Sequence, residues 1–134
     1  MVEIAARYEG TLRCVARHGP SGVAITTDAP VDNQGKGASF SPTDLVATAL
    51  LTCAMTTMGI VAQRMGFDVD GMTGEVRKGM AADPRRIAEL PVVIALPGHL
   101  DDRQRELLEA TARGCPVAVS LHPDIAAGMT FETT

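Results

Sequence analysis

A run of 18 residues without a charged side chain, from Leu45 to Ala62, is the feature that most limits how this chain can fold. It reaches the lower limit of length at which a membrane-spanning helix has to be considered. Four threonines, several alanines and Gly59 lower its hydrophobicity, however, and no loop rich in lysine or arginine sets an orientation. The run is therefore typical of a core helix in a soluble protein, and we expect no association with a membrane.

The residues around this run mark where the helix begins and ends. Ser41 suits the N-cap, Pro42 suits the first helical position, and Asp44 stands where a capping-box acid is found. Gly66 suits the position after the last helical residue, Met65. The sequence thus predicts a helix from Pro42 to about Met65. Because this helix is apolar nearly all round, we expect it to be covered on most sides.

Alternating and turn-forming residues divide the rest of the chain into short strands and a second long helix. We expect strands over 2–9, 11–17, 23–27, 67–79, 86–96 and 129–133, with a surface loop over 28–40. Because Pro91 has no N–H to donate, we expect part of the strand that contains it to lie at a sheet edge or in a bulge. The second helix takes Asp101 as its N-cap and Gln104 at the third helical position, and Gly114 follows its end.

Length and composition narrow the class of protein. The 134 residues are enough for a single domain over 1–134 with its own core. With three Phe, one Tyr and no Trp, the core and any pocket must be aliphatic. The net charge of −4, without a basic block, argues against nucleic acid as a partner. The N-terminal residues lack the features of a secretory signal, so we expect the protein in the cytoplasm.

Three cysteines, Cys14, Cys53 and Cys115, are the candidates for chemistry. They form no CxxC pair and have no close histidine, so we expect no metal site. In a reducing cytosol a permanent disulfide is not expected, whereas a transient catalytic one is permitted. Cys14 lies in a strand and Cys53 in the apolar helix, where a free cysteine is most often a small buried hydrophobe. Cys115 precedes Pro116 and suits the N-cap of a short helix, where the helix dipole lowers the pKa of a thiol.

Two motifs around these cysteines resemble those of the OsmC/Ohr superfamily. The first is Ser41-Pro42-Thr43-Asp44-Leu45 followed by Ala47, Ala49, Leu50 and Cys53, and the second is Cys115-Pro116-Val117 followed by Ser120-Leu121. Asp28-Ala29-Pro30 and the order of the elements extend the similarity over nearly the whole chain. The resemblance implies an α+β fold with antiparallel sheets packed on two main helices. It also implies an intertwined homodimer with its active sites at the interface.

The resemblance further implies an activity. Active members of the superfamily are thiol peroxidases, in which the first cysteine, here Cys53, attacks the O–O bond of an organic hydroperoxide and becomes a sulfenic acid. The second cysteine, here Cys115, condenses with it to a disulfide, which a dithiol such as a lipoylated protein reduces. Neither a metal nor an organic cofactor is needed. An aliphatic pocket suits such a substrate, and two separated cysteines can form a reversible disulfide.

Activation of Cys53 requires a positive charge, since a thiol in apolar surroundings stays protonated. In the superfamily an arginine of the first hairpin supplies it. Arg17 is the best match here and Arg13 is an alternative, while either could be only a solvated arginine on a strand. The best-characterised peroxidases hold this arginine with a glutamate directly after the helix-opening proline, where this chain has Thr43. Asp44 lies about 100° further round the helix and suits a capping role better.

The missing carboxylate at Thr43 keeps a second hypothesis open. A non-enzymatic OsmC-like dimer would keep the fold and both cysteines, but would bind a small apolar ligand or sense the redox state. A third hypothesis gives both cysteines a purely structural role as buried packing residues.

Overall fold

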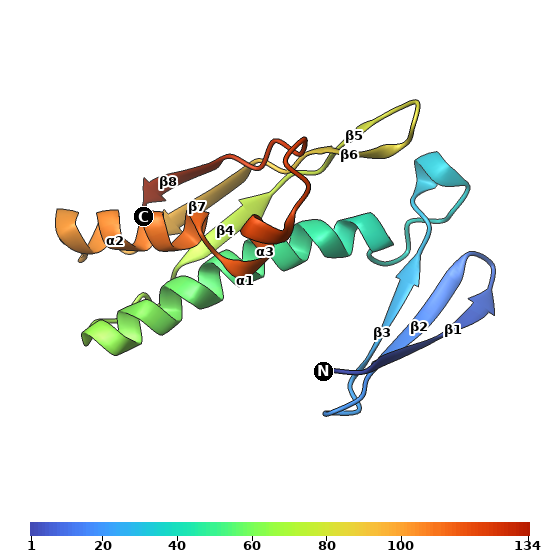
Figure 1. Cartoon of the computed structure of the whole chain (residues 1–134), viewed down its shortest axis with the longest axis horizontal. Helices are drawn as coiled ribbons and strands as arrows, with labels where there is room; N and C mark the ends of the chain where they lie inside the picture. Colours follow the sequence, from blue (N-terminus) through green and yellow to red (C-terminus); the bar gives the residue numbers. More distant parts are fainter. The chain divides into compact units, whose positions relative to one another are not determined.

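A computed structural model describes all residues of the chain, 1–134, as two compact units, Met1–Val46 and Ala47–Thr134. Eight strands, three α-helices and one short 3-10 helix follow one another along the chain (Figure 1). The protein is therefore of the mixed α+β class, as expected.

The first unit holds an antiparallel three-stranded sheet. Its strands β1 (Ile4–Gly10), β2 (Arg13–His18) and β3 (Ala24–Asp28) pair in the order β1-β2-β3, close to the ranges predicted from the sequence. The predicted loop follows and contains one turn of 3-10 helix, η1 (Val31–Asn33).

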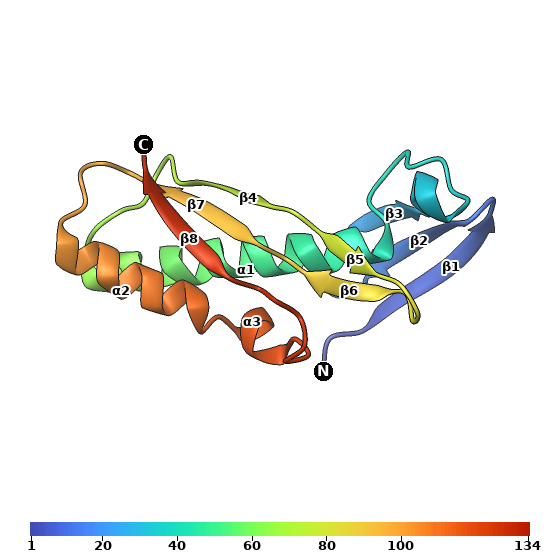
Figure 2. The same ribbon diagram turned by 90° about the horizontal axis from the view of Figure 1, so that it is seen from above.

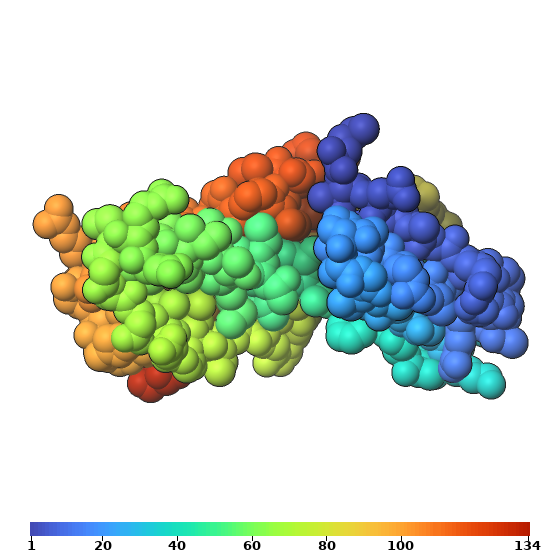
Figure 3. Space-filling view, turned by 90° about the horizontal axis from the view of Figure 1, so that it is seen from below, coloured from blue at the N-terminus to red at the C-terminus, as the bar shows by residue number.

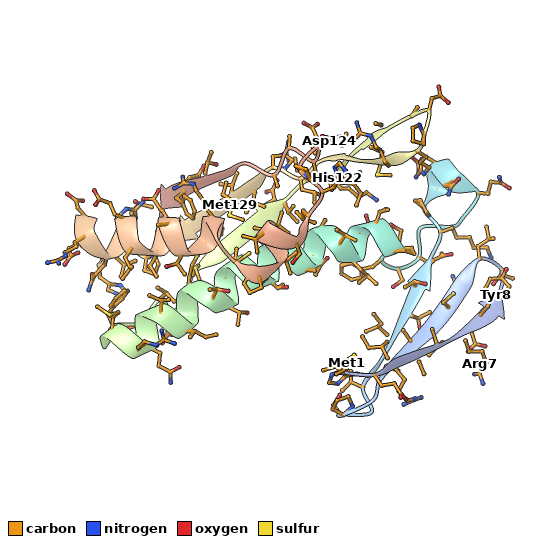
Figure 4. All side chains as sticks on the ribbon, viewed as in Figure 1. Met1, Arg7, Tyr8, His122, Asp124 and Met129 are labelled. Carbon is orange, nitrogen blue, oxygen red and sulfur yellow. The ribbon has the colours of Figure 1, made fainter.

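The two faces of this sheet differ in chemistry. Neighbouring residues of a strand point to opposite faces, so Arg7 and Tyr8, labelled in Figure 4, lie on opposite faces of β1. The cross-strand register gives one face, here called the apolar face, the residues Ile4, Ala6, Tyr8, Cys14, Ala16 and Ile25, with His18 and Thr27 as its polar members. The other face carries Arg7, Arg13, Arg17 and Asp28.

Helix α1 (Pro42–Met65) has the bounds that the sequence predicted. The capping box is also confirmed, because the Ser41 N–H donates to Asp44 Oδ2 at 2.9 Å and the Asp44 N–H donates to Ser41 Oγ at 3.1 Å. These two hydrogen bonds satisfy backbone groups that a helix terminus otherwise leaves unpaired.

Burial along α1 differs from the expectation. The buried residues, Ala47, Leu50, Ala54, Met58 and Ala62, form a single stripe at helical spacing. Opposite this stripe, Thr52, Thr56 and Ile60 are exposed, and Figure 3 shows green atoms of α1 open at the surface. The prediction that α1 is covered on most sides is therefore wrong within the second unit, whose other elements leave this outer side of the helix open.

Among the helices, α1 is the one long and apolar enough to cross a membrane by length and composition. A core helix of a soluble protein passes the same test, so this property is weak evidence for a membrane span.

Residues 67–96 form four short strands where the sequence predicted two. These are β4 (Thr73–Val76), β5 (Gly79–Ala81), β6 (Arg86–Glu89) and β7 (Val92–Leu96). β4 pairs with β7 and β5 pairs with β6, both antiparallel, and Figure 2 shows the β5-β6 hairpin continuing from the β4-β7 pair. Pro91 lies between β6 and β7, in keeping with its lack of an N–H to donate to a ladder.

The last strand, β8 (Met129–Thr133), pairs with β7 in the parallel sense, which gives the sheet order β4-β7-β8. The expectation of antiparallel sheets is therefore wrong at this pair. The connection from β7 to β8 runs through α2 (Asp102–Arg113) and α3 (Pro116–Ser120). A crossover through a helix returns the chain to the same end of the sheet, so the two strands run in the same direction.

Helix α2 is bounded as predicted and completes the core of the second unit. Asp101 and Gln104 form its capping box, and Gly114 is its C-cap. In both ribbon views α1 and α2 lie on one face of the β4-β7-β8 sheet. Residues of all three, among them Leu50, Ile94 and Leu108, are completely buried between them. The core is aliphatic, as the composition requires.

Candidate active site

Cys53 lies in α1, between the buried stripe and the exposed side of the helix. Its side chain is half-buried. Its closest polar neighbour is one turn further on, where Thr57 Oγ1 lies 4.0 Å from Cys53 Sγ and donates to the Cys53 carbonyl at 2.7 Å. Cys53 is therefore not the fully buried packing residue that its place in an apolar helix alone would favour.

Cys115 is the N-cap of α3, as the sequence predicted, and Pro116 follows at the first helical position. It is completely buried, with 0% of its surface exposed. Its sulfur accepts a hydrogen bond from the Ala118 N–H at 3.5 Å, so the side chain closes the first turn of the helix.

The helix start does not lower the pKa of Cys115 as the sequence suggested. Burial raises the pKa of its thiol and outweighs the Ala118 N–H, which acts in the opposite direction. The Cys53 side chain raises the Cys115 pKa further, as a hydrogen-bond partner and through charge. The helix is only five residues long, which limits what its dipole can contribute.

This effect of Cys53 on Cys115 means that the fold brings the two side chains together inside the second unit, although 61 residues separate them in the sequence. The two thiols are unequal: one is half-exposed, and the other is buried and held in its protonated form at neutral pH. Such a pair can divide the chemistry of a disulfide cycle, with attack from the accessible sulfur and condensation from the protected one.

Both candidate arginines lie on the face of the first sheet opposite the apolar face. Arg17 Nη1 donates to the carbonyl of Gly22 at 2.8 Å, in the turn between β2 and β3. Arg13 Nη2 lies 3.5 Å from Oδ2 of Asp28, which stands opposite it in the register of β2 and β3. The sequence reasoning missed this buried aspartate as a functional candidate, although counting back from the turn at 18–22 would have placed it opposite Arg13.

Thr43 and Cys14 both lie apart from the cysteine pair in the first unit's residue range. Thr43 Oγ1 lies 3.2 Å from Ser41 Oγ, beside the capping box of α1. Cys14 is half-buried on the apolar face of the first sheet, opposite Tyr8 and Thr27, rather than in a closed core.

Iodoacetamide is expected to modify Cys53 well before Cys115 in the folded, reduced protein, because alkylation needs an accessible thiolate. We expect the alkylation rate of Cys115 to be lower than that of Cys53 by a factor of roughly 100 or more, since access to Cys115 requires local opening of the structure. Peptide mass spectrometry over a time course at pH 8 measures both rates. Cys14, also half-buried, is the internal reference, and equal rates at Cys53 and Cys115 would contradict the burial described above.

Comparison with known proteins identifies a family to which the chain is similar. The family described as OsmC-like protein matches residues 35–128, a range that includes both Cys53 and Cys115. A comparison with curated proteins gives no match.

Several solved structures are similar to the chain over nearly its whole length. A protein from Psychrobacter arcticus 273-4, provisionally described as an osmotic stress induced and detoxification response protein, is 48% identical, with a TM-score of 0.93 over 98% of this chain and 96% of that one. An organic hydroperoxide resistance protein from Legionella pneumophila is 16% identical, with a TM-score of 0.75 over 98% and 96% of the two chains. OhrB of Bacillus subtilis is 15% identical, with a TM-score of 0.70 over 98% of each chain. The last two likenesses establish a shared fold.

Proposed function

The chain belongs to the family of OsmC-like proteins, and on this premise we propose that it is a thiol peroxidase that reduces organic hydroperoxides through Cys53 and Cys115. Proteins with this fold include two that are named for organic hydroperoxide resistance. The 48% identical relative is described as a protein of the osmotic stress and detoxification response. The proposed role is defence against oxidative stress.

The proposed cycle begins with the Cys53 thiolate, which attacks the terminal oxygen of the hydroperoxide. The O–O bond breaks, Cys53 becomes a sulfenic acid, and the alkoxide takes a proton and leaves as an alcohol. The Cys115 sulfur then attacks the sulfenic sulfur, and water leaves as the disulfide forms. An external dithiol, such as a lipoylated protein, returns both cysteines to thiols and is itself oxidised to a disulfide. No cofactor enters the cycle.

One observation carries this proposal, namely the half-exposed Cys53 beside the buried Cys115. A nucleophile for a small substrate has to be reachable, whereas a resolving thiol is better kept away from other reagents until the sulfenic acid has formed. The burial and raised pKa of Cys115 suit the second role and argue against a first attack from this residue.

The proposed function also needs a cation that favours the Cys53 thiolate. By resemblance an arginine of the first hairpin supplies it, and Arg17 and Arg13 are the candidates. The absence of a glutamate at Thr43 is the specific observation that favours the second candidate function, a non-enzymatic dimer that binds a small apolar ligand or senses redox state.

We also propose that the protein is a homodimer with its active sites at the interface. Each unit on its own supports this. In the second unit, the outer side of α1 carries no charge and is uncovered, with Ile60 50% exposed between threonines. In the first unit, Ile4, Tyr8 and Ile25 of the apolar face are likewise exposed. Large apolar surfaces of this kind mark interaction sites in soluble proteins.

Replacement of Ile60 by aspartate is expected to dissociate the dimer. A carboxylate buried without a partner costs several kcal/mol, so the dissociation constant should rise roughly 100-fold or more. Sedimentation equilibrium measures the dissociation constant of the dimer. Val119→Asp is the matched control, since Val119 is 72% exposed and lies outside α1. A monomeric wild type, or an Ile60→Asp variant that dimerises as the wild type does, would contradict the proposal.

The peroxidase activity itself is tested with the reduced wild-type protein in the presence of a dithiol. Mixed with cumene or tert-butyl hydroperoxide, it should consume peroxide and, when the dithiol is omitted, form one intramolecular disulfide between Cys53 and Cys115. Peptide mass spectrometry identifies the disulfide. Binding of an apolar ligand without any peroxide consumption would instead support the non-enzymatic candidate.

A further inference from the structure

Thr57, one turn after Cys53 in α1, is a polar side chain beside the attacking sulfur that the proposed cycle does not use. Both residues belong to the second unit and to one continuous helix. Side chains four residues apart lie on the same face of a helix, one above the other. Thr57 Oγ1 accordingly lies 4.0 Å from Cys53 Sγ, and the helix itself holds the two groups in this relation.

The hydroxyl proton of Thr57 is already engaged. Thr57 Oγ1 donates to the carbonyl of Cys53 at 2.7 Å, a normal length for an O–H···O hydrogen bond. This bond to the carbonyl one turn earlier also keeps the threonine side chain in one rotamer. A hydroxyl has one proton to donate and two lone pairs that accept. Thr57 can therefore offer the neighbouring sulfur only the role of acceptor.

The gap between this oxygen and the sulfur suits the oxidised cysteine better than the reduced one. At 4.0 Å the two atoms are too far apart for an effective hydrogen bond, so the thiol gains little from Thr57. Attack on a hydroperoxide adds one oxygen to the sulfur of Cys53. An S–O bond inclined toward Thr57 brings that oxygen to roughly the 2.7–2.8 Å of an O–H···O hydrogen bond. The sulfenic hydroxyl is a donor and Thr57 has lone pairs to accept, so the two groups are complementary.

We propose that Thr57 is a positioning residue that accepts a hydrogen bond from the sulfenic acid of Cys53 and holds it in its neutral form until Cys115 attacks. The inference rests on the proposed function in one respect, that Cys53 is oxidised to a sulfenic acid. It gives a residue of α1 a part in the second half of the cycle, after the hydroperoxide has been reduced.

Two reactions compete for this sulfenic acid. In the first, the Cys115 thiol attacks the sulfenic sulfur, the S–O bond breaks, and the oxygen leaves as water with the thiol proton. In the second, the sulfenic sulfur attacks another organic hydroperoxide, the O–O bond breaks, a sulfinic acid forms and an alcohol leaves. The ionised sulfenate is the better nucleophile for this second reaction, as a thiolate is compared with a thiol. A hydrogen bond made only by the neutral form therefore directs Cys53 toward the disulfide.

The products of oxidation without a reductant test this inference. Reduced protein is mixed with excess cumene hydroperoxide, and mass spectrometry over a time course measures sulfenic acid, disulfide and sulfinic acid at Cys53. Thr57→Val replaces the hydroxyl by a methyl group of similar size. In this variant the ratio of sulfinic acid to disulfide should rise about fivefold, the effect of one neutral hydrogen bond. The rate of the first attack should change less than about twofold, since the reduced thiol makes no effective bond to Thr57.

Two further variants separate positioning from a general effect on the helix. Thr57→Ser keeps the hydroxyl and should return the product ratio to that of the wild type. Thr52→Val is the matched control, because Thr52 Oγ1 makes the same kind of bond, to the Thr48 carbonyl at 2.8 Å, from the exposed side of α1. It should leave the product ratio unchanged. Circular dichroism checks that all three variants are folded.

The outcomes separate this inference from the proposed function. A wild type that forms the Cys53–Cys115 disulfide, together with a Thr57→Val variant of unchanged product ratio or with a ratio that Thr52→Val raises equally, would overturn the inference and leave the peroxidase standing. A wild type that consumes no organic hydroperoxide would overturn the peroxidase.

In that second case hydrogen peroxide in excess still tests Thr57, in a Cys115→Ser background where no disulfide with Cys115 can form. Dimedone labelling then follows the lifetime of the sulfenic acid on Cys53, which Thr57→Val should shorten about fivefold. An equal lifetime with and without the Thr57 hydroxyl, or no sulfenic acid in either protein, would contradict the inference.

Discussion

A Cys53→Ser variant is expected to lose peroxide consumption by roughly a thousandfold or more, because removal of a covalent nucleophile leaves no other route to the O–O bond. A serine hydroxyl at this position is not ionised at neutral pH and has no comparable reactivity toward peroxide. The consumption of tert-butyl hydroperoxide with a dithiol present measures the loss. Retained activity in this variant would end the assignment of Cys53 as the attacking residue.

A Cys115→Ser variant is the matched comparison, since it removes the second sulfur and leaves the first. When the dithiol is omitted, it should reduce about one equivalent of peroxide per chain and then hold a sulfenic acid on Cys53, which dimedone traps for mass spectrometry. Loss of even this first equivalent would contradict the order of roles given to the two cysteines.

A Leu50→Ala variant is expected to be destabilised by about 2–5 kcal/mol, the range found for large-to-small changes at fully buried positions. Leu50 is completely buried within the stripe of α1 that faces the core. The cost combines the lost transfer free energy of the side chain with the cavity that it leaves. Urea unfolding monitored by circular dichroism measures the difference.

Thr52→Ala is the control for this change, because Thr52 lies in the same helix but on its exposed side. Its hydroxyl donates to the Thr48 carbonyl of the preceding turn at 2.8 Å, a bond that contributes little to helix stability. We expect a change within about 0.5 kcal/mol. A Leu50→Ala variant no less stable than Thr52→Ala would show that the α1 stripe is not the core.

The parts of the fold that were predictable from the sequence are those set by local chemistry. Ser41, Pro42 and Asp44 fix the start of α1 through hydrogen bonds within one turn, and the same holds for Asp101 and Gln104 at α2. Caps of this kind depend on residues three apart, so a single sequence contains the whole signal.

Features that depend on distant segments were harder to predict. The parallel pairing of β8 with β7 follows from how the intervening helices pack, which strand propensity does not report. The raised pKa of Cys115 likewise follows from burial against residues far away in the sequence, whereas the sequence shows only its place at a helix start. The motif around the cysteines indicated that they act as a pair, but it could not indicate which sulfur is protected.

Burial of Cys115 also restricts how an oxidised protein of this kind would be recycled. An incoming thiol could reach only the Cys53 sulfur, so Cys115 would have to be the leaving group. A thiol with a raised pKa leaves slowly, and once released beside Cys53 it could expel a single bound thiol again. A reductant with a second sulfur escapes this reversal by closing its own disulfide, so for the proposed cycle we expect dithiols to be better reductants than monothiols such as glutathione.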